Sequence, residues 1–481
     1  MRRIRAAVLA LAIIVVTLPV LSGVLPRAGA STARAATTGQ AAVEHHFKAF
    51  VSAIATATAT ATATAKQGHY VTTVQDKSDA VSFVRQLAQL NLDTQLLAVD
   101  PNHPVFFRDP DPFSVPGSDP PVRSGIYDPD NISYIAIVNG SDQYRITGKR
   151  GNSDDLSVQA ITGFPGAGST GDPTATLLKS QIAVNSNGTY TINVGGSAQQ
   201  GNWLPTVPQT TLISVREAFT NWSDAVGDQL RIQTVGQPGQ PVATLTNRQL
   251  ITAIDAATSA VTQQASYWVT LWGTLLSSLT PNQVRAPSPT QGGLAGQLSS
   301  LSHFDLAPGQ ALVVSVGKSN AVYQGFEAAD AFAQSLPYAT HQSSLNATQA
   351  QLSSDGRYYF VVAARDPGVP NWIDTEGYTQ GFLFLRWQEL TGTLPPGDDP
   401  TSQVVALSAV RRVLPPGTPT VTPAQRKAQL AARDKAESHR LRTSSNQAEG
   451  VLTGYLRQIA TDVGRGPLLA VYTDSILGSR L

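Results

Sequence analysis

One long segment near the middle of the chain keeps the periodicity of an α-helix from end to end. Thr246, with Gln249 three residues later, forms a capping box that starts a helix, and Pro281 stops it. We therefore predict one long helix within 241–282 that bridges the parts of the chain on either side. Its apolar stripe is predicted to pack into the core, and comprises Leu250, Ile254, Val261, Ala265, Trp268, Trp272 and Leu275.

The part before this helix, 101–240, is predicted to be a β-rich unit. It opens with a proline-dense stretch to about residue 130, which excludes helix and central strand. Asn139-Gly140 and Asn187-Gly188 supply the positive φ of tight turns, so they predict two hairpins. The apolar period becomes two, and the predicted strands are 132–138, 143–148, 182–184, 189–194, 210–216 and 229–235.

The part after the helix, 283–394, is predicted to be a second β-rich unit with strands at 311–317, 357–365 and 381–390. The remainder, 395–481, is predicted to be a linker and a C-terminal helical tail. Its first part is rich in Pro, Gly and Thr, as linkers are. The dense Lys, Arg, Glu and Ala content that follows predicts a solvent-exposed helix, and the helices predicted in this tail are 424–442 and 451–463.

Two helices are predicted in the N-terminal segment, 36–100. The first has apolar residues at helical spacing, but the Ala-Thr alternation over 55–65 predicts a frayed end, because threonine's branched Cβ weakens helix. The second covers 79–97. The whole pattern predicts an α+β fold with antiparallel β-sandwich or jelly-roll-like units, N-terminal helices and a long bridging helix.

The N-terminus has the order of a secretory signal peptide. Three arginines precede an apolar run over 6–25, and two A-x-A sites follow it. We predict a signal peptide over 1–35, cleaved after Ala35, and hence a secreted or extracytoplasmic protein. An uncleaved anchor would have a similar pattern. No later stretch is long and apolar enough to span a bilayer, so we expect no stable membrane insertion after cleavage.

The composition restricts the partners. The chain has no cysteine, so it has no disulfide and no thiolate chemistry. A net charge of +1 with 14% charged residues provides no electrostatic footprint for nucleic acid. We therefore expect no nucleic-acid partner, and favour small molecules or other proteins as partners; a carbohydrate or lipid is one such small molecule.

The sequence shows no established catalytic or metal motif. The seven histidines have neither H-x-H nor H-x-x-x-H spacing, and serine occurs in no G-x-S-x-G elbow. The glycine-rich stretch 163–171 lies among predicted strands and is predicted to be a loop. We therefore predict no metal site and no cofactor.

Two segments of the chain resemble a known family. The first segment runs from Tyr127-Asp128-Pro129-Asp130-Asn131 through Tyr144-Arg145-Ile146-Thr147-Gly148-Lys149-Arg150-Gly151. The second runs from Gly201-Asn202-Trp203-Leu204-Pro205 through Ser214-Val215-Arg216-Glu217-Ala218-Phe219. Both resemble the bacterial domain of unknown function 1214 (DUF1214) family. The clearest resemblance covers 127–236, with a looser one over 335–387. It implies antiparallel β-sandwich or jelly-roll modules combined with helical parts. It implies no catalytic residues, so activity stays open.

Acidic and aromatic residues in one long loop and the strand after it are the candidate ligand-binding residues. Tryptophan in a polar loop with neighbouring acids and an arginine suits a carbohydrate or polar lipid, although a tryptophan there can also close the end of a sandwich. The acid pairs Asp109/Asp111 and Asp128/Asp130 are predicted to initiate turns; the alternative is that the alternating prolines hold each pair so that it presents two acids to a sugar or to calcium. The candidate site residues are Asp366, Asn371, Trp372, Asp374, Glu376 and Arg386.

Two functional hypotheses follow. The first is an exported binding or structural module for a small polar or amphiphilic ligand. The alternative is an extracytoplasmic hydrolase or lyase that uses Asp or Glu and Arg in a sandwich cleft.

A short internal repeat suggests where a site would lie. Asn202-Trp203 recurs as Asn371-Trp372, and each is followed by a strand with an arginine, Arg216 or Arg386. We predict that the two β-rich units share this local architecture, with any site near the second copy, where Asp374 replaces Pro205.

Overall fold

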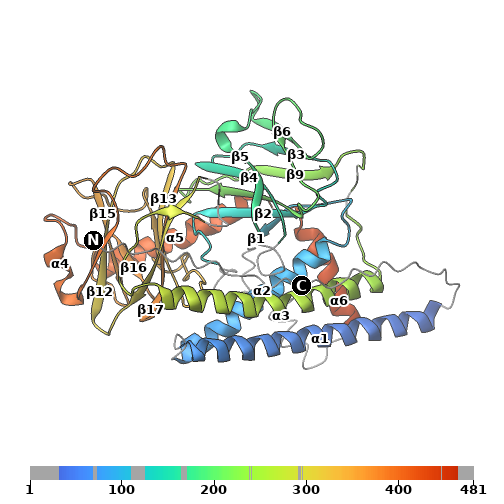
Figure 1. The fold of residues 1–481 in the computed structure, drawn as a ribbon, viewed down its shortest axis with the longest axis horizontal. Coiled ribbons are helices and arrows are strands. Elements are labelled where there is room, and N and C mark those ends of the chain that lie inside the picture. The colour runs from blue at the N-terminus through green and yellow to red at the C-terminus, as the bar shows by residue number, and fades with distance from the viewer. Residues whose placement is uncertain are drawn as a thin grey trace, which may run out of the picture.

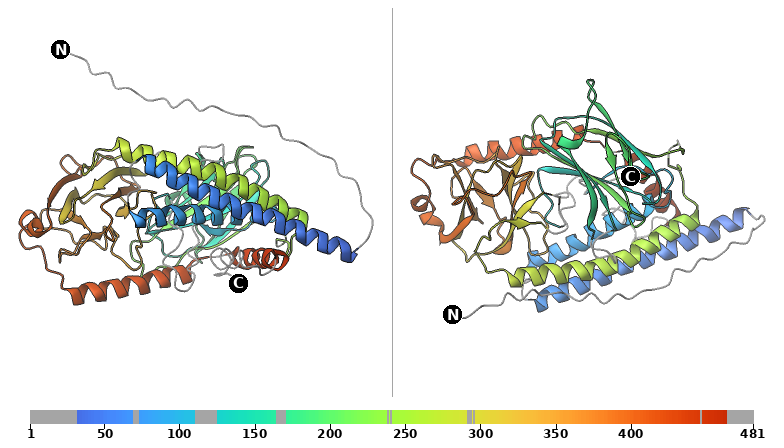
Figure 2. Two further views of the ribbon diagram at one scale, coloured as in Figure 1. Left: turned by 90° about the horizontal axis from the view of Figure 1, so that it is seen from below. Right: turned by 45° about the horizontal axis from the view of Figure 1, so that its top comes forward.

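Four helices from the N-terminal segment, the middle of the chain and its C-terminal tail lie together along one side of the molecule in the computed structural model (Figures 1 and 2). Their shared core also receives side chains from both β-rich units, including Ile135 and Phe382. The structure describes residues 32–68, 73–109, 125–163, 171–237, 239, 241–290, 294, 296–445 and 447–463. Residues 1–31 of the predicted signal peptide, and Asp111, lie outside them. The helices are α1 (Thr32–Gln67), α2 (Val74–Leu97), α3 (Asn247–Ser278) and α6 (Glu449–Val463).

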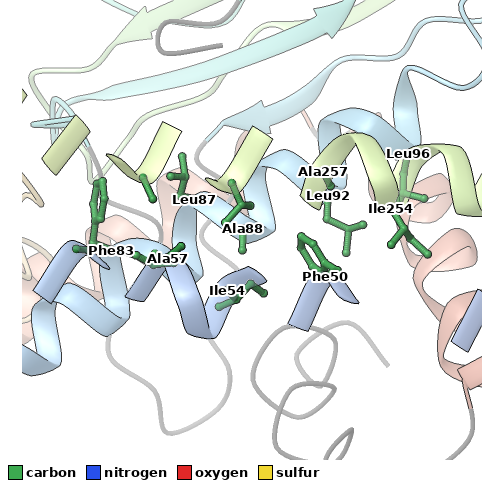
Figure 3. Close-up of a cluster of buried hydrophobic side chains, with 14 of the residues drawn as sticks. Phe50, Ile54, Ala57, Phe83, Leu87, Ala88, Leu92, Leu96, Ile254 and Ala257 are labelled. Carbon is green, nitrogen blue, oxygen red and sulfur yellow. The ribbon is translucent and has the colours of Figure 1, made fainter. Parts of the chain in front are cut away.

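The Ala-Thr stretch predicted to fray is regular helix and completes α1. Ala57, Ala61 and Ala65 recur every four residues and are buried in the helical core. The hydroxyls of Thr58 and Thr62 donate to the carbonyl oxygen four residues earlier, at 2.8 Å in each case. The prediction was wrong because it weighed threonine's propensity and missed the period-four alanines. Figure 3 shows Phe50, Ile54 and Ala57 on the inner face of α1.

Small residues on α1 let it pack closely on its neighbours, so enlarging one should be costly. We expect Ala61→Leu to lower the free energy of unfolding by about 1–3 kcal/mol, because added methylenes in a filled core force side chains off their rotamers. Ala59 lies on the exposed face of the same helix, so Ala59→Leu is the matched control and should be near neutral. Urea titration of both variants checks this. Equal losses would contradict close packing at Ala61.

The long bridging helix is confirmed as α3. Its capping box forms as predicted: the Thr246 hydroxyl accepts from the backbone N–H of Gln249, and the Gln249 side chain accepts from the N–H of Thr246. Trp268 and Trp272 stack with ring centroids 5.6 Å apart, and Trp272 meets Phe382 edge-on at 5.9 Å. Both tryptophans pack against the core but stay half-buried. Their rings therefore cover the edge of the core and do not lie at its centre.

The first β-rich unit is a sandwich of two sheets. The five-stranded sheet has the order β1-β2-β8-β4-β5 and the four-stranded sheet the order β7-β6-β3-β9. Side chains from both sheets make one core. The strands are β1 (Phe107–Asp109), β2 (Asn131–Ile137), β3 (Tyr144–Lys149), β4 (Asp155–Ile161), β5 (Pro173–Leu178), β6 (Thr189–Val194), β7 (Trp203–Leu204), β8 (Leu212–Ala218) and β9 (Gln229–Thr234).

The second β-rich unit repeats this topology strand for strand. Its five-stranded sheet is β10-β11-β17-β13-β14 and its four-stranded sheet is β16-β15-β12-β18. Each strand takes the place of the one nine numbers earlier. The fold is therefore α+β, as predicted. The strands are β10 (Ser288–Pro289), β11 (Leu298–Asp305), β12 (Gln310–Gly317), β13 (Tyr323–Ala329), β14 (Ser344–Asn346), β15 (Arg357–Ala363), β16 (Trp372–Asp374), β17 (Gln380–Gln388) and β18 (Thr401–Ala406).

Two predicted local features differ from the structure. Asn139-Gly140 does not close a hairpin, because β2 and β3 belong to different sheets and the turn carries the chain across the sandwich. Asn187-Gly188 does form a tight turn, with Gly188 at φ 82°. The 182–184 segment before it is not a strand. Turn chemistry predicted where the chain reverses, but it could not predict which strand becomes the partner.

The predicted linker after 394 contains part of the second sandwich. Strand β18 pairs along β12, so this unit extends beyond the predicted boundary. A short helix, α4 (Val410–Val413), then covers the outer face of the four-stranded sheet through Val410 and Leu414. The predicted charged helix is present as α5 (Pro423–Thr443), but it is not wholly solvated. Its buried side chains are Arg426, Glu437 and Arg440.

Candidate functional site

The internal repeat corresponds to equivalent structure in the two sandwiches. In each copy the asparagine side-chain amide makes two hydrogen bonds to the backbone of one residue, accepting from its N–H and donating to its carbonyl. Asn202 bonds Ala183 in this way and Asn371 bonds Gln351, at 2.7–2.8 Å. Each tryptophan starts a short edge strand that pairs in parallel with its neighbour. The indole N–H of Trp203 donates to the Gly195 carbonyl and that of Trp372 to the Ala363 carbonyl. The asparagine and tryptophan parts of the predicted shared architecture are confirmed.

A surface groove lies beside the second copy of the repeat. Its walls are the turn 351–354, the segment 369–371 that leads into β16, and the segment 414–419 after α4, with Tyr359 of β15 between them. Its volume is about 210 Å³, below the ~300–1,000 Å³ of drug-sized pockets. We call these residues the β15–β16 groove.

The chemistry of the groove is neutral. Its lining offers hydroxyls, amides and backbone groups together with proline and leucine side chains, and none of the described residues that line it is charged. The Tyr359 hydroxyl donates to Asp355 at 2.7 Å, which fixes the ring. Burial and this bond to the Asp355 carboxylate both raise the pKa of Tyr359, so the phenol stays protonated at neutral pH. Such a site suits a small uncharged polar molecule.

Of the predicted site residues, only Asn371 lines the groove. Trp372 is buried beneath it, and the Arg426 guanidinium lies 5.3 Å from its ring centroid. Asp366 pairs with the same Arg426 at 2.9 Å. These two residues therefore fix the start of α5 against the strand end. Their polar groups are used within the protein.

Asp374 and Glu376 come together at a histidine that the sequence analysis did not single out. His341 Nδ1 lies 3.0 Å from Asp374 Oδ2, and its Nε2 lies 3.0 Å from Glu376 Oε1. Glu376 reaches the ring from a positive φ of 51°. The cluster is part-exposed, but both ring nitrogens face carboxylates. Neither nitrogen is therefore left to act as a base on a substrate.

Arg386 lies apart from the other predicted residues, at the junction of the two sandwiches. Its guanidinium bonds Glu327 and the carbonyl of Ile126, and Nε is 3.9 Å from Asp128. Arg386, Glu327 and Asp128 are all buried. The predicted convergence of Arg386 with Asp374 in one cleft is therefore not found.

The Asp128/Asp130 pair initiates a turn as predicted and also joins the two sandwiches. The N–H of Asp130 donates to Asp128 Oδ1 at 3.1 Å. The Tyr323 hydroxyl of the second sandwich lies 2.8 Å from both carboxylates, and Asn346 donates to Asp130 at 2.7 Å. Burial, with Asp128 adding to it, raises the pKa of Asp130 to about 6.

Two further carboxyl pairs are buried away from the groove. Burial raises the pKa of Glu217 to about 8, with Asp228 beside it adding to the shift. Burial raises the pKa of Asp330 to about 8 as well, and here the neighbouring acid is Asp79. A tyrosine hydroxyl bonds each pair, from Tyr134 at 3.1 Å and Tyr378 at 2.8 Å. These pairs are enclosed, so they affect stability more than ligand chemistry.

The groove residues that the sequence analysis missed have one usable signal. Ser353, Ser354, Tyr359 and 414–419 have no motif of their own. The run Pro415-Pro416-Gly417-Thr418-Pro419 forms a rigid wall of the groove, since proline fixes φ. In the sequence its composition predicted only a linker, because the turn on the other side of the groove lies sixty residues earlier in the chain.

Comparison with known proteins identifies the fold. A crystal structure of an uncharacterized protein from Burkholderia cenocepacia superposes with a TM-score of 0.67 at 22% identity, over 78% of this chain and 99% of the other. The VPA0106 protein from Vibrio parahaemolyticus matches with a TM-score of 0.38 at 10% identity, over 67% and 100%. No family model and no curated protein matches the sequence. The first likeness establishes a shared fold for most of the chain.

Proposed function

We propose that this protein is an exported β-sandwich binding module that takes a small uncharged polar ligand, such as a carbohydrate unit, in the β15–β16 groove. The observation that supports this most is the lining of the groove, which combines neutral hydrogen-bonding groups with rigid apolar walls and no charge. Small-molecule sites have this mixture of apolar surface and a few placed polar groups.

The positions of the charged residues favour binding over hydrolysis or lyase chemistry. A catalytic cleft of the predicted kind needs an acid and an arginine beside the substrate. Asp366 is paired with Arg426, Asp374 with His341, and Arg386 with Glu327. None of these six side chains lines the groove.

The proposal includes the export that the N-terminal sequence predicts and the kinship with the DUF1214 family that its motifs suggest. None of the described helices has the length and apolar character needed to cross a bilayer. Intact-mass measurement of secreted protein tests the export. A chain starting at Ala36 would support it, and a membrane-bound chain retaining residues 1–35 would refute it.

Blocking the groove should abolish binding. We expect Ser354→Trp to weaken binding at least tenfold, because the indole would fill much of the groove, whose volume is about 210 Å³. The measurement is calorimetric titration with neutral mono- and disaccharides after a thermal-shift screen, since a ligand that binds only the folded state raises its melting temperature.

The chain offers a matched control for this variant. Ser186 occupies the same position in the equivalent turn of the first sandwich, where Gly188 takes the place of Gly356 at nearly the same φ. Ser186→Trp should leave binding unchanged. If both variants bind like the wild type, or if neither the screen nor the titration finds a neutral ligand, the groove is not the site.

A further inference from the structure

The two sandwiches differ at the outer faces of their four-stranded sheets. In the second sandwich this face is apolar, with Val313, Val361 and Trp372, and α4 covers it. In the first sandwich the outward positions of β3 and β9 are all exposed. Figure 1 shows β3, β6 and β9 on the side of that sandwich away from the helical layer. One copy of the fold therefore has a covered face and the other an open one.

The open face is positively charged. Arg145 and Lys149 of β3 and Arg231 of β9 are exposed on it, and none of the strands β3, β6, β7 and β9 contains an acidic residue. Thr147 pairs with Arg231, so Arg231 lies diagonally between Arg145 and Lys149. Diagonal neighbours across two strands are about 7–8 Å apart. The three cations therefore form a row along the sheet.

The acids near this row in sequence lie outside it. Asp228 precedes β9 but is buried and bonded by the Tyr190 hydroxyl at 2.6 Å. Asp142 lies in the turn before β3. A protein with a net charge of only +1 thus concentrates three cations on one flat face.

We propose that the open face of the β3, β6, β7 and β9 sheet binds an extended acidic polysaccharide. A glycan with a carboxylate on successive sugars presents a row of anions that matches the row of cations. Thr147 lies between the two cations of β3, and Thr191 and Asn193 of β6 lie opposite Thr147 and Arg145. Their hydroxyls and amide can bond sugar hydroxyls. Trp203 stands half-exposed at the sheet edge beside Asn193, where it can contact a sugar ring.

The composition of the face favours a glycan over the other polyanions. Single-stranded nucleic acid is bound by stacking successive bases on several aromatic rings, whereas this face has Trp203 alone. Protein interfaces have an apolar, aromatic-rich centre, and the outward side chains in the middle of this sheet are threonine, asparagine, glutamine and the cations. This site is separate from the β15–β16 groove, so neither proposal depends on the other.

Binding of hexagalacturonate to the full chain tests the proposal, with its fully methyl-esterified form as the uncharged counterpart. We expect the acidic oligomer to bind in 50 mM salt and to be released in 500 mM salt, where charges are screened within a few ångströms. The ester should bind at least tenfold more weakly. The triple variant R145Q/K149Q/R231Q should weaken binding of the acid at least tenfold.

The matched control removes the same charge elsewhere. Lys427, Lys435 and Arg457 are exposed on α5 and α6, and K427Q/K435Q/R457Q should bind like the wild type. Both triple variants change exposed side chains, so their melting temperatures should equal that of the wild type. Wild-type binding by R145Q/K149Q/R231Q would overturn the proposal. Equal affinity for hexaglutamate or oligothymidylate would overturn the assignment to a glycan.

Discussion

Replacing Arg386 by methionine should destabilise the protein by about 3–5 kcal/mol, because it leaves the buried carboxyl groups of Glu327 and Asp128 without their hydrogen-bonding cation. Arg386 bonds Glu327 of the same sandwich and the carbonyl of Ile126, which leads into the first sandwich. Methionine fills a similar volume, so the loss would measure charge and hydrogen bonding more than packing. Chemical denaturation gives the free energy of unfolding.

Two further variants distinguish the loss of the ion pair from a packing defect at position 386. In E327Q/R386M the carboxyl is neutral as well, so the double variant should recover part of the loss. Arg216 takes the equivalent place on β8 and is partly exposed, so R216M should cost less than R386M. If R386M unfolds at the wild-type denaturant concentration, the junction does not depend on this pair.

The protein should be more stable at pH 5 than at pH 8. Burial raises the pKa of Glu217 and of Asp330 to about 8 in the folded state, whereas unfolded Glu and Asp titrate near ~4. Below pH ~4 both states hold the proton and the stabilisation is complete. As the pH rises toward 8 only the folded state keeps it, so stability is lost. Buried His303 has the opposite effect on stability. Burial lowers its pKa in the folded state, so below pH 6.5 the unfolded state holds this proton more readily and stability falls as the pH drops.

Amide variants test the source of this pH dependence. E217Q and D330N resemble the protonated acids, so each should flatten the fall in melting temperature between pH 5 and pH 8. D224N alters an exposed carboxyl and should leave the slope unchanged. A wild-type melting temperature that rises steadily from pH 5 to pH 8 would show that the buried pairs are ionised in the folded protein.

Local patterns in the sequence were sufficient for the elements with strong periodicity. The α3 capping box, the strands predicted at 311–317 and 357–365, and the equivalence of Asn202 and Asn371 all follow from short-range chemistry. Each depends on hydrogen bonds or apolar faces that a few neighbouring residues determine. The α+β fold class followed from the same patterns.

The features that were missed depend on distant parts of the chain. Strand β18 was predicted as linker because it lies in a stretch rich in Pro, Gly and Thr, and its mostly exposed residues become a strand only by pairing with β12. Arg426 and Arg440 were predicted to be solvated but are buried. No pattern in the sequence indicated this, because the Asp366 carboxylate and the Pro129 carbonyl that they bond lie in distant turns. His341, which joins Asp374 and Glu376, lies more than thirty residues before them. Proximity of this kind has no local signal.

The place where a neutral ligand binds decides whether the β15–β16 groove is the site. A crystal structure of the protein soaked with the tightest neutral saccharide from the thermal-shift screen would show it. We expect density between the 351–354 turn and the 414–419 segment, in contact with Tyr359 and Asn371. Density at any other place, with this groove filled by water alone, would contradict it.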